Sequence, residues 1–169
     1  ENSLQRGEVA ILTVAGGDGT RLGINGPKGT FAISPITRKS IFQLHAEKIM
    51  AVQKRYNTRI LWYIMTSQNN DSATQNFFKA HKFFGLDPHQ VSFFTQGMLP
   101  VVDLQGNVLM DSKSNIIMSP NGHGGVLVAL KEKDVLNEIK RRGIKNIFYH
   151  QVDNILIKMA DPVFVGYHW

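Results

Sequence analysis

The segment that most constrains this chain is residues 14–29, VAGGDGTRLGINGPKG, at the end of an apolar run over residues 9–14. The segment contains six glycines, one arginine and one lysine. Because glycine has no Cβ atom, main-chain N–H groups can come close to an anion, and the two cations add positive charge beside those dipoles. The apolar run predicts a buried strand, and the segment after it predicts a loop that wraps phosphate.

Length and composition indicate one domain. The chain has 169 residues, 43% of them hydrophobic, which is enough to bury a sizeable core. No apolar run approaches the roughly 20 residues that span a bilayer, and ENSLQRGE at the start lacks the apolar core of a secretory signal. The lack of cysteine excludes disulfides and thiolate metal sites and fits a reducing compartment. We therefore expect a cytoplasmic protein without membrane association.

The two ends of the sequence suggest that the chain is part of a longer polypeptide. The first residue is not methionine, and Asp161-Pro162 is typical of the cap and first position of a helix that begins close to the last residue. We therefore expect further chain beyond residue 169.

The formal charge of +6 raises the question of nucleic-acid binding. The basic residues are scattered along expected helices, and the densest run, KRRG at residues 140–143, lies where a helix is expected to end. Cations at that position favour the helix dipole. A nucleic-acid surface needs a clustered basic face, so we expect no nucleic-acid partner. A positive balance also suits a small, phosphate-rich ligand.

Hydrophobic patterns predict strands that alternate with helices. Strands are expected at residues 9–14, 60–65, 91–94 and 146–152, with short irregular strands around 101–103, 107–109 and 116–118. Helices are expected from Ser40, in a capping box with Gln43, to about Tyr56; from Asp71 or Ser72 to about Gly85; over 126–130; and over 133–142. This alternation favours a mainly parallel sheet with helices on both faces.

Polar segments follow several of these apolar runs. They are the glycine loop, Gln96-Gly97, the NGHGG loop at residues 121–125, and Asp153-Asn154. Ligands of parallel α/β sheets bind beyond the carboxyl ends of the strands. We therefore expect four segments that are distant in sequence to converge on one crevice.

Two common phosphate-loop patterns do not fit. The GxxxxGK[ST] pattern is absent because Lys28 follows Pro27, which excludes a P-loop kinase. Gly17, Gly19 and Gly23 form GxGxxxG, but Pro27 prevents a helix from continuing through the loop. No acidic residue stands about 20 positions further on at the end of a second strand, which disfavours a dinucleotide site.

The loop AGGDGTRLG with Pro27-Lys28 resembles the signature of the UDP-sugar pyrophosphorylases. WYIMTS, HKFFGL, QGMLP, GHGG and VDN follow in order and resemble the UDP-N-acetylhexosamine (UDP-N-acetylglucosamine) pyrophosphorylase branch. His123 departs from that branch, which usually has asparagine there, whereas the UDP-glucose branch is closer to this GHG. The family is therefore better defined than the branch.

The resemblance implies a Rossmann-like, GT-A-like nucleotidyltransferase fold of the α/β class that is incomplete in this chain. Residues 1–169 would be the N-terminal nucleotide-binding part of the catalytic domain, with the sugar-binding part missing. The implied partners are UTP, a sugar 1-phosphate and the remainder of the catalytic domain.

The implied reaction transfers UMP from UTP to a sugar 1-phosphate, with N-acetylglucosamine 1-phosphate as the first candidate, and releases pyrophosphate. The sugar phosphate oxygen attacks the α-phosphorus in line, so catalysis consists of positioning and charge stabilisation, with Mg²⁺ as cofactor. Two alternatives stay open: a UTP-binding fragment without activity of its own, and a UDP-glucose-type enzyme.

The resemblance gives the two cations of the loop catalytic roles. Arg21 would contact the outgoing pyrophosphate through two charge-assisted hydrogen bonds, and Lys28 would meet the α-phosphate. The alternatives are an arginine that closes the loop by pairing with Asp18, and a solvated lysine in a turn.

The other implied roles concern the nucleotide and the metal. Gln96 would read uracil, since an amide offers both a donor and an acceptor, and Gly122 would place main-chain groups against the same base. Asp153 would bind Mg²⁺ together with phosphates. The alternatives are turn glycines that need positive φ and polar residues at strand ends; His45, His81, His89 and His150 are interpreted as structural. The nucleotide contacts implied are Ala15, Gly16, Gly17, Gly19, Thr20, Gln96, Gly122, His123 and Asp153.

Overall fold

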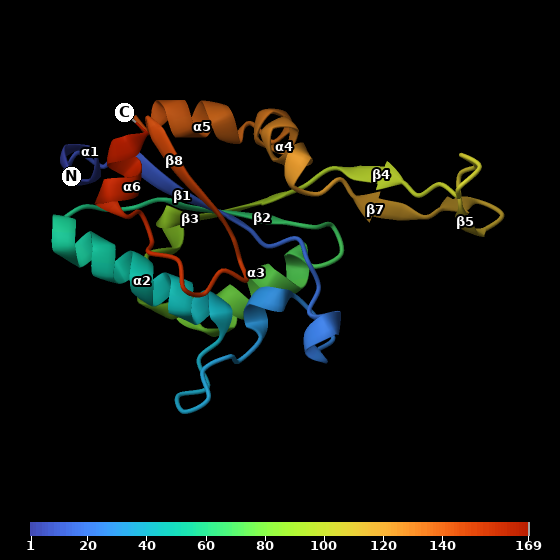
Figure 1. Cartoon of the computed structure of the whole chain (residues 1–169), viewed down its shortest axis with the longest axis horizontal. Coiled ribbons are helices and arrows are strands. Elements are labelled where there is room, and N and C mark those ends of the chain that lie inside the picture. The colour runs from blue at the N-terminus through green and yellow to red at the C-terminus, as the bar shows by residue number, and fades with distance from the viewer. Residues whose placement is uncertain (169) are drawn as a thin grey trace.

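The computed structural model describes residues 1–168, and for Arg21 the main chain only. Its centre is a parallel four-stranded sheet in the order β3-β2-β1-β8 (Figure 1). The strands are β1 (Val9–Val14), β2 (Trp62–Thr66), β3 (Val91–Thr95) and β8 (Asn146–Gln151). All four strands expected from the sequence are confirmed, although β2 lies one to two residues later than expected.

Helices cover both faces of the sheet (Figure 1). On one face lie α2 (Ile41–Tyr56) and α3 (Asp71–Ala80), and on the other lie α4 (Val126–Glu132) and α5 (Val135–Arg141). Successive residues of β1 alternate between the two cores, and all six are buried. Burial on both faces is the reason for the continuous apolar run in the sequence. The predicted α/β fold class is confirmed.

The helix caps follow the sequence closely. The Ser40 hydroxyl accepts a hydrogen bond from the Gln43 main-chain N–H at 3.1 Å, as the capping box predicts. The second hydrogen bond of a capping box, from the Ser40 N–H to the Gln43 side chain, is absent among the described residues. The Gln43 side chain donates to Glu47 instead. The helix expected at Asp161-Pro162 is α6 (Pro162–Tyr167). A single-turn helix, α1 (Asn2–Gln5), was not predicted, since one turn is too short to show a period.

The expected end of the second helix was wrong. The helix stops at Ala80 rather than near Gly85, and a tight turn follows at Lys82–Gly85. Phe83 and Phe84 adopt left-handed φ values of 52° and 55° in this turn, a conformation that costs roughly 1–2 kcal/mol per residue. Both rings pack against the core on the α2 side, so tertiary packing overrides the helical pattern.

A two-stranded ribbon projects from the sheet between β3 and α4 (Figure 1). In it β4 (Met98–Pro100) pairs with β7 (Met118–Pro120), and β5 (Met110–Ser112) pairs with β6 (Asn115–Ile116), all antiparallel. The strand positions expected here were inaccurate: residues 101–103 and 107–109 share only an isolated bridge between Val102 and Val108. Most of the ribbon is exposed on both faces, which removes the alternation that marks a half-buried strand.

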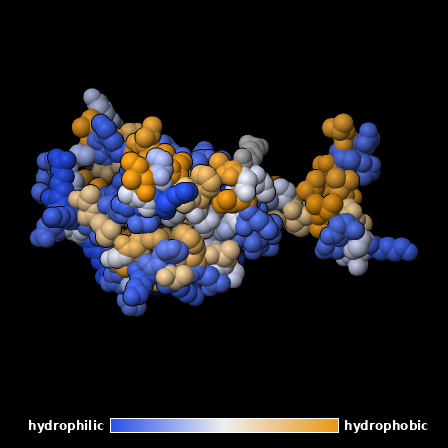
Figure 2. All heavy atoms as spheres, turned by 90° about the horizontal axis from the view of Figure 1, so that it is seen from below, coloured by the Kyte–Doolittle hydropathy of each residue, from blue (hydrophilic) through white to orange (hydrophobic). Residues whose placement is uncertain are grey.

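Hydrophobic side chains gather on the projecting ribbon (Figure 2). Its exposed apolar residues are Leu99, Val102, Leu104, Val108, Leu109, Met110, Ile116, Ile117 and Met118. None of the helices in the described part of the chain has the length and apolar character needed to cross a membrane.

Candidate functional site

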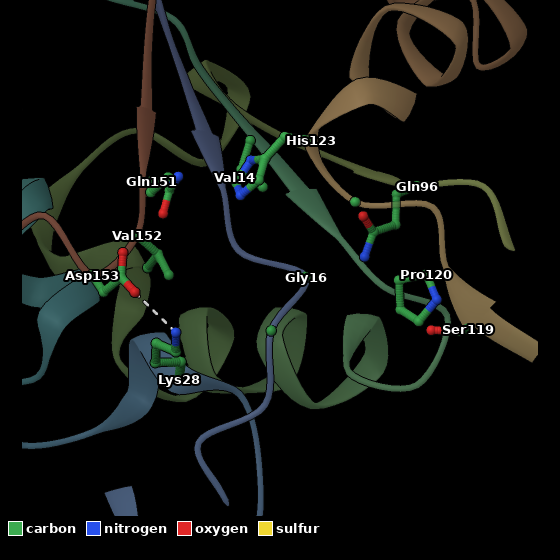
Figure 3. A pocket seen from close by; sticks show the side chains of 12 residues that line it. Val14, Gly16, Lys28, Gln96, Ser119, Pro120, His123, Gln151, Val152 and Asp153 are labelled. Atoms are coloured by element: carbon green, nitrogen blue, oxygen red, sulfur yellow. Dashed lines mark hydrogen bonds and ion pairs between the residues drawn. The ribbon is translucent and has the colours of Figure 1, made fainter. Parts of the chain in front are cut away.

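The four polar segments meet in one crevice at the carboxyl ends of β1 and β8 (Figure 3). The crevice has a volume of about 350 Å³. The expected convergence is therefore confirmed. The residues that line the crevice are Val14, Gly16, Gly17, Lys28, Gln96, Ser119, Pro120, Gly122, His123, Gln151, Val152 and Asp153.

An ion pair joins the glycine loop to the end of β8. Lys28 Nζ donates to Asp153 Oδ2 at 2.9 Å, and both side chains are partly exposed to the crevice (Figure 3). The hydrogen bond from Lys28 lowers the pKa of Asp153, so the carboxyl is ionised at neutral pH. Lys28 begins a short turn, Lys28–Thr30, and Asp153 holds its ammonium group at the crevice.

The main chain of the glycine loop is held by its carbonyl groups. Asn70 Nδ2 donates to the carbonyls of Ala15 and Gly17, at 3.2 and 3.4 Å. The Lys28 N–H also donates to the Gly17 carbonyl, at 3.2 Å. The N–H groups of Gly16 and Gly17 donate to no acceptor among the residues that the structure describes. These two N–H groups at the crevice wall are suited to an anion.

Gly16 and Gly19 of this loop are needed for space, whereas Gly23 and Gly26 have positive φ values of 73° and 150°. Gly16, Gly17 and Gly19 do not have positive φ values, which corrects the turn-glycine alternative. A Cβ on Gly16 would lie 2.2 Å from Gln96 Nε2, and one on Gly19 would lie 2.3 Å from Ile24 Cγ1. Gly16 therefore lets the Gln96 amide pack directly on the loop.

Gln96 lies on the opposite side of Gly16 from Lys28 and Asp153 (Figure 3). It directly follows β3, its N–H donates to the Thr66 carbonyl at 2.8 Å, and only 4% of the residue is exposed. The main chain thus fixes where this amide enters the crevice. One end of the crevice is charged and the other carries an amide.

The NGHGG loop is held against Gln96 by Asn121. The Asn121 N–H donates to the Gly97 carbonyl at 3.0 Å. A Cβ on Gly125 would lie 2.0 Å from Asn121 Oδ1, so the side chain fits only beside glycine. Gly122 has φ 68° and ψ −159°, a conformation essentially restricted to glycine. Packing and backbone conformation together bring Gly122 to the crevice.

His123 pairs with a residue that sequence reasoning missed. Its Nδ1 atom lies 2.8 Å from the hydroxyl of Tyr149 on β8. Ser119, Pro120 and Gln151 also line the crevice unpredicted, and Asn70 anchors the loop. Gln151 lies two residues before Asp153, so strand spacing could have indicated it. Ser119 and Pro120 depend on the path of the ribbon, and Asn70 depends on the position of α3.

Other predicted residues do not reach the crevice wall. Ala15 is 1% exposed beneath the loop, and Gly19 and Thr20 lie at the start of a short turn, Thr20–Leu22. The Arg21 side chain lies outside the described residues. The predicted nucleotide contacts of Ala15, Gly19 and Thr20 and the predicted catalytic role of Arg21 stay predictions, as do the roles of the residues that line the crevice. No group of three or more His, Asp or Glu side chains that could hold a metal occurs within residues 1–168 as described.

The fold and the crevice define a class of protein. A parallel α/β sheet that gathers a lysine, main-chain N–H groups and amides beyond its strand ends is typical of proteins that bind phosphorylated ligands. Comparison with known sequences then defines the family. The chain belongs to the UTP–glucose-1-phosphate uridylyltransferase family, whose profile matches residues 1–169.

The relatives agree with this assignment and confirm the resemblance seen in the sequence. UDP-N-acetylglucosamine pyrophosphorylase of Saccharomyces cerevisiae is 45% identical over 169 residues, covering 98% of this chain and 35% of the yeast protein. The inhibitor-bound crystal structure of the uridine diphosphate N-acetylglucosamine pyrophosphorylase of Trypanosoma brucei is 36% identical, with a TM-score of 0.91 over 98% of this chain and 36% of that one.

The fold extends to more distant relatives. The structure of an H191L mutant of UDP-glucose pyrophosphorylase from Leishmania major has a TM-score of 0.80 at 19% identity, over 99% of this chain and 35% of that one. That likeness concerns the fold alone. The chain spans about a third of the length of these relatives.

Proposed function

We propose that this chain forms the UTP-binding part of a uridylyltransferase, which transfers UMP from UTP to a sugar 1-phosphate and releases pyrophosphate. The observation that carries the proposal is the convergence of Lys28, the N–H groups of Gly16 and Gly17, and Gln96 in one crevice. Phosphate needs cations and N–H donors, and a base edge needs an amide. Both sets are present in the crevice, where Gly16 lies between Lys28 and Gln96 (Figure 3).

The two ends of the crevice suit different parts of the nucleotide. The charged end, with Lys28 and the glycine N–H groups, suits the phosphates. The other end, where Gln96 packs on Gly16 beside Gly122, suits uracil. In this orientation the Lys28 ammonium stabilises negative charge on the α-phosphate oxygens while the sugar phosphate attacks in line.

Asp153 fits the magnesium ion that the family resemblance implies. Its carboxylate is ionised, partly exposed and directed into the crevice, and it is a hard oxygen donor (Figure 3). Mg²⁺ is commonly held by one or two carboxylates and takes its other ligands from phosphates and water. When bound, the ion would neutralise phosphate charge. The role of the chain is to present Asp153 opposite Lys28.

The sugar and the setting of the complete protein are further parts of the proposal. We propose N-acetylglucosamine 1-phosphate because the yeast relative at 45% identity is named for UDP-N-acetylglucosamine, whereas the UDP-glucose enzyme shares 19%. The remainder of the catalytic domain would supply the sugar pocket. A cytoplasmic location also stays a proposal, supported by the cysteine-free sequence.

Calorimetry and pyrophosphate release test the proposal. The polypeptide that contains this chain and the sugar pocket is expected to bind UTP with Mg²⁺ and to release pyrophosphate on addition of N-acetylglucosamine 1-phosphate. Lys28→Ala, and separately Arg21→Ala, should lower turnover by a factor on the order of 100 or more, because each removes a charge-assisted phosphate contact. Unchanged turnover in both variants would contradict the proposal. UTP binding without turnover by residues 1–169 alone would support the alternative of a binding fragment.

A further inference from the structure

A buried polar cluster of four side chains lies beneath the crevice. It consists of Thr13 on β1, Trp62 on β2, His150 on β8 and His45 on α2. Their exposed fractions are 0%, 0%, 3% and 0%. The imidazole rings of His45 and His150 meet edge to face, with centroids 4.9 Å apart. None of these four side chains lines the crevice.

The hydrogen bonds of the cluster run in one direction. A carbonyl oxygen only accepts, so His150 Nδ1 donates to the Gln151 carbonyl at 2.9 Å. In the neutral ring, His150 Nε2 is then an acceptor, and the Thr13 hydroxyl donates a hydrogen bond to it at 2.7 Å. The indole N–H of Trp62 donates to Thr13 Oγ1 at 2.7 Å. These contacts fix the tautomer and the orientation of His150.

The cluster also holds the main chain around Asp153. His45 Nε2 donates to the Val152 carbonyl at 2.7 Å. Lys48, close to one turn further along α2, donates to the carbonyls of Ile155 and, at 3.0 Å, of Ile157. Side chains of α2 and β8 therefore hold four carbonyl groups on both sides of the predicted metal-binding aspartate.

We propose that His45 and His150 are positioning residues, which set the place of the Asp153 carboxylate opposite Lys28 by holding the Gln151 and Val152 carbonyls. The inference rests on the proposed function, because the role of Asp153 is part of it. Among the described side chains, Lys28 alone donates a hydrogen bond to the Asp153 carboxylate, so its place depends on its own main chain. Outer residues that orient a metal ligand typically change metal affinity 10–100-fold when altered.

The test compares His45→Leu with His45→Gln. Leucine removes the donor to the Val152 carbonyl, whereas glutamine keeps a side-chain N–H donor of comparable reach. UTP affinity is measured by calorimetry over a range of Mg²⁺ concentrations, and a thermal melt verifies folding. We expect His45→Leu to raise the half-saturating Mg²⁺ concentration about tenfold while metal-free UTP affinity changes less than twofold. His45→Gln should restore most of the Mg²⁺ response. The matched control is His89→Leu, at an exposed histidine outside the crevice.

A double-mutant cycle with Asp153→Asn separates positioning from a merely structural role. If His45 acts through Asp153, His45→Leu adds no further loss of Mg²⁺ response in the Asp153→Asn background. An unchanged half-saturating Mg²⁺ concentration in His45→Leu, or an equal shift in both backgrounds, would overturn the inference. If His45→Leu does not fold, His150→Leu takes its place, since it removes the donor to the Gln151 carbonyl, and an unchanged Mg²⁺ response again overturns the inference. A wild-type chain that binds no UTP contradicts the proposed function itself, which is a different result.

Discussion

At the scale of single residues, the Lys28–Asp153 ion pair holds together two groups that are proposed to bind different parts of the ligand. The 2.9 Å contact lies at one end of the crevice, with one partner from each of two segments distant in sequence. Partly exposed ion pairs are worth only about 1 kcal/mol or less, so phosphate and Mg²⁺ can replace this one. The pair therefore keeps two charges in place until the ligand separates them.

This exchange predicts opposite effects of Asp153→Asn with and without metal. Without Mg²⁺, the variant is expected to bind UTP about three- to tenfold more tightly, since Lys28 is released and a negative charge near the phosphates is removed. Mg²⁺ is expected to raise the UTP affinity of the wild type, and Asp153→Asn should lose this gain. Calorimetry in EDTA and in Mg²⁺ measures both effects, with Asp103→Asn on the ribbon as the control. Weaker metal-free binding in Asp153→Asn would contradict the exchange.

Gly16 is predicted to control recognition of the base through Gln96. The Cβ atom of Gly16→Ala would lie 2.2 Å from Gln96 Nε2, so the amide must move. We expect UTP affinity to fall about tenfold and the preference for UTP over CTP to shrink, because the amide no longer meets the base edge. Competition binding with both nucleotides measures this change. Gly124→Ala is the control, since a Cβ there meets no atom within 4 Å; equal losses in the two variants would refute the steric argument.

At the scale of elements, α2 connects the fold to the crevice. Its N-terminus is capped by Ser40, its apolar face packs on the sheet, and two polar side chains, His45 and Lys48, reach the segment after β8. The helical period in the sequence shows only that a helix buries one face. The two hydrogen-bonding roles on that face depend on which strand lies beneath, and strand order is a tertiary property.

Burial of the histidine pair between α2 and β8 predicts a loss of stability in mild acid. Desolvation, with a smaller contribution from His45, lowers the pKa of His150 from 6.5 to about 4. Below pH 6.5, His150 binds a proton in the unfolded chain but stays neutral in the folded chain until the pH approaches 4. The free energy of unfolding therefore falls from about pH 6.5 towards pH 4. Between pH 7 and pH 5 the loss is about 2 kcal/mol from His150.

Urea unfolding of the wild type and of His150→Gln at pH 7 and pH 5 measures this term. The wild type is expected to lose more stability than the variant over this interval, because glutamine does not titrate. Desolvation also lowers the pKa of His45, so some loss should remain in His150→Gln. Equal losses in both proteins would show that His150 titrates normally in the folded state.

At the scale of the whole molecule, the chain has two unlike parts. The sheet and its helices form a closed core on both faces, whereas the ribbon from β4 to β7 projects from it with exposed apolar side chains (Figures 1 and 2). The base of the ribbon, at Ser119 and Pro120, forms part of the crevice wall. The ribbon thus contributes to the wall of the crevice, although its pattern in the sequence was irregular.

The sequence by itself determined the elements that depend on local chemistry. The strand Val9–Val14, the strand that begins at Asn146, the Ser40 cap and the glycine loop were all predicted, because an apolar run, a capping residue and a cluster of glycines each have a short-range signature. The motif residues also indicated the family. Their individual roles in binding and catalysis stay predictions.

Only the tertiary structure decided which side chains meet. Asn70 beneath the loop, Tyr149 beside His123, and the left-handed turn at Phe83 and Phe84 have no local signature. Each depends on packing between segments far apart in the chain. Lys28 and Asp153 are likewise 125 positions apart in the sequence. The parallel pairing of β1 and β8 brings the segments that follow them together, so that the two side chains meet at 2.9 Å. Local sequence specifies the strands of the central sheet and the glycine loop, but the sheet order that joins them results from packing helices on both faces at once.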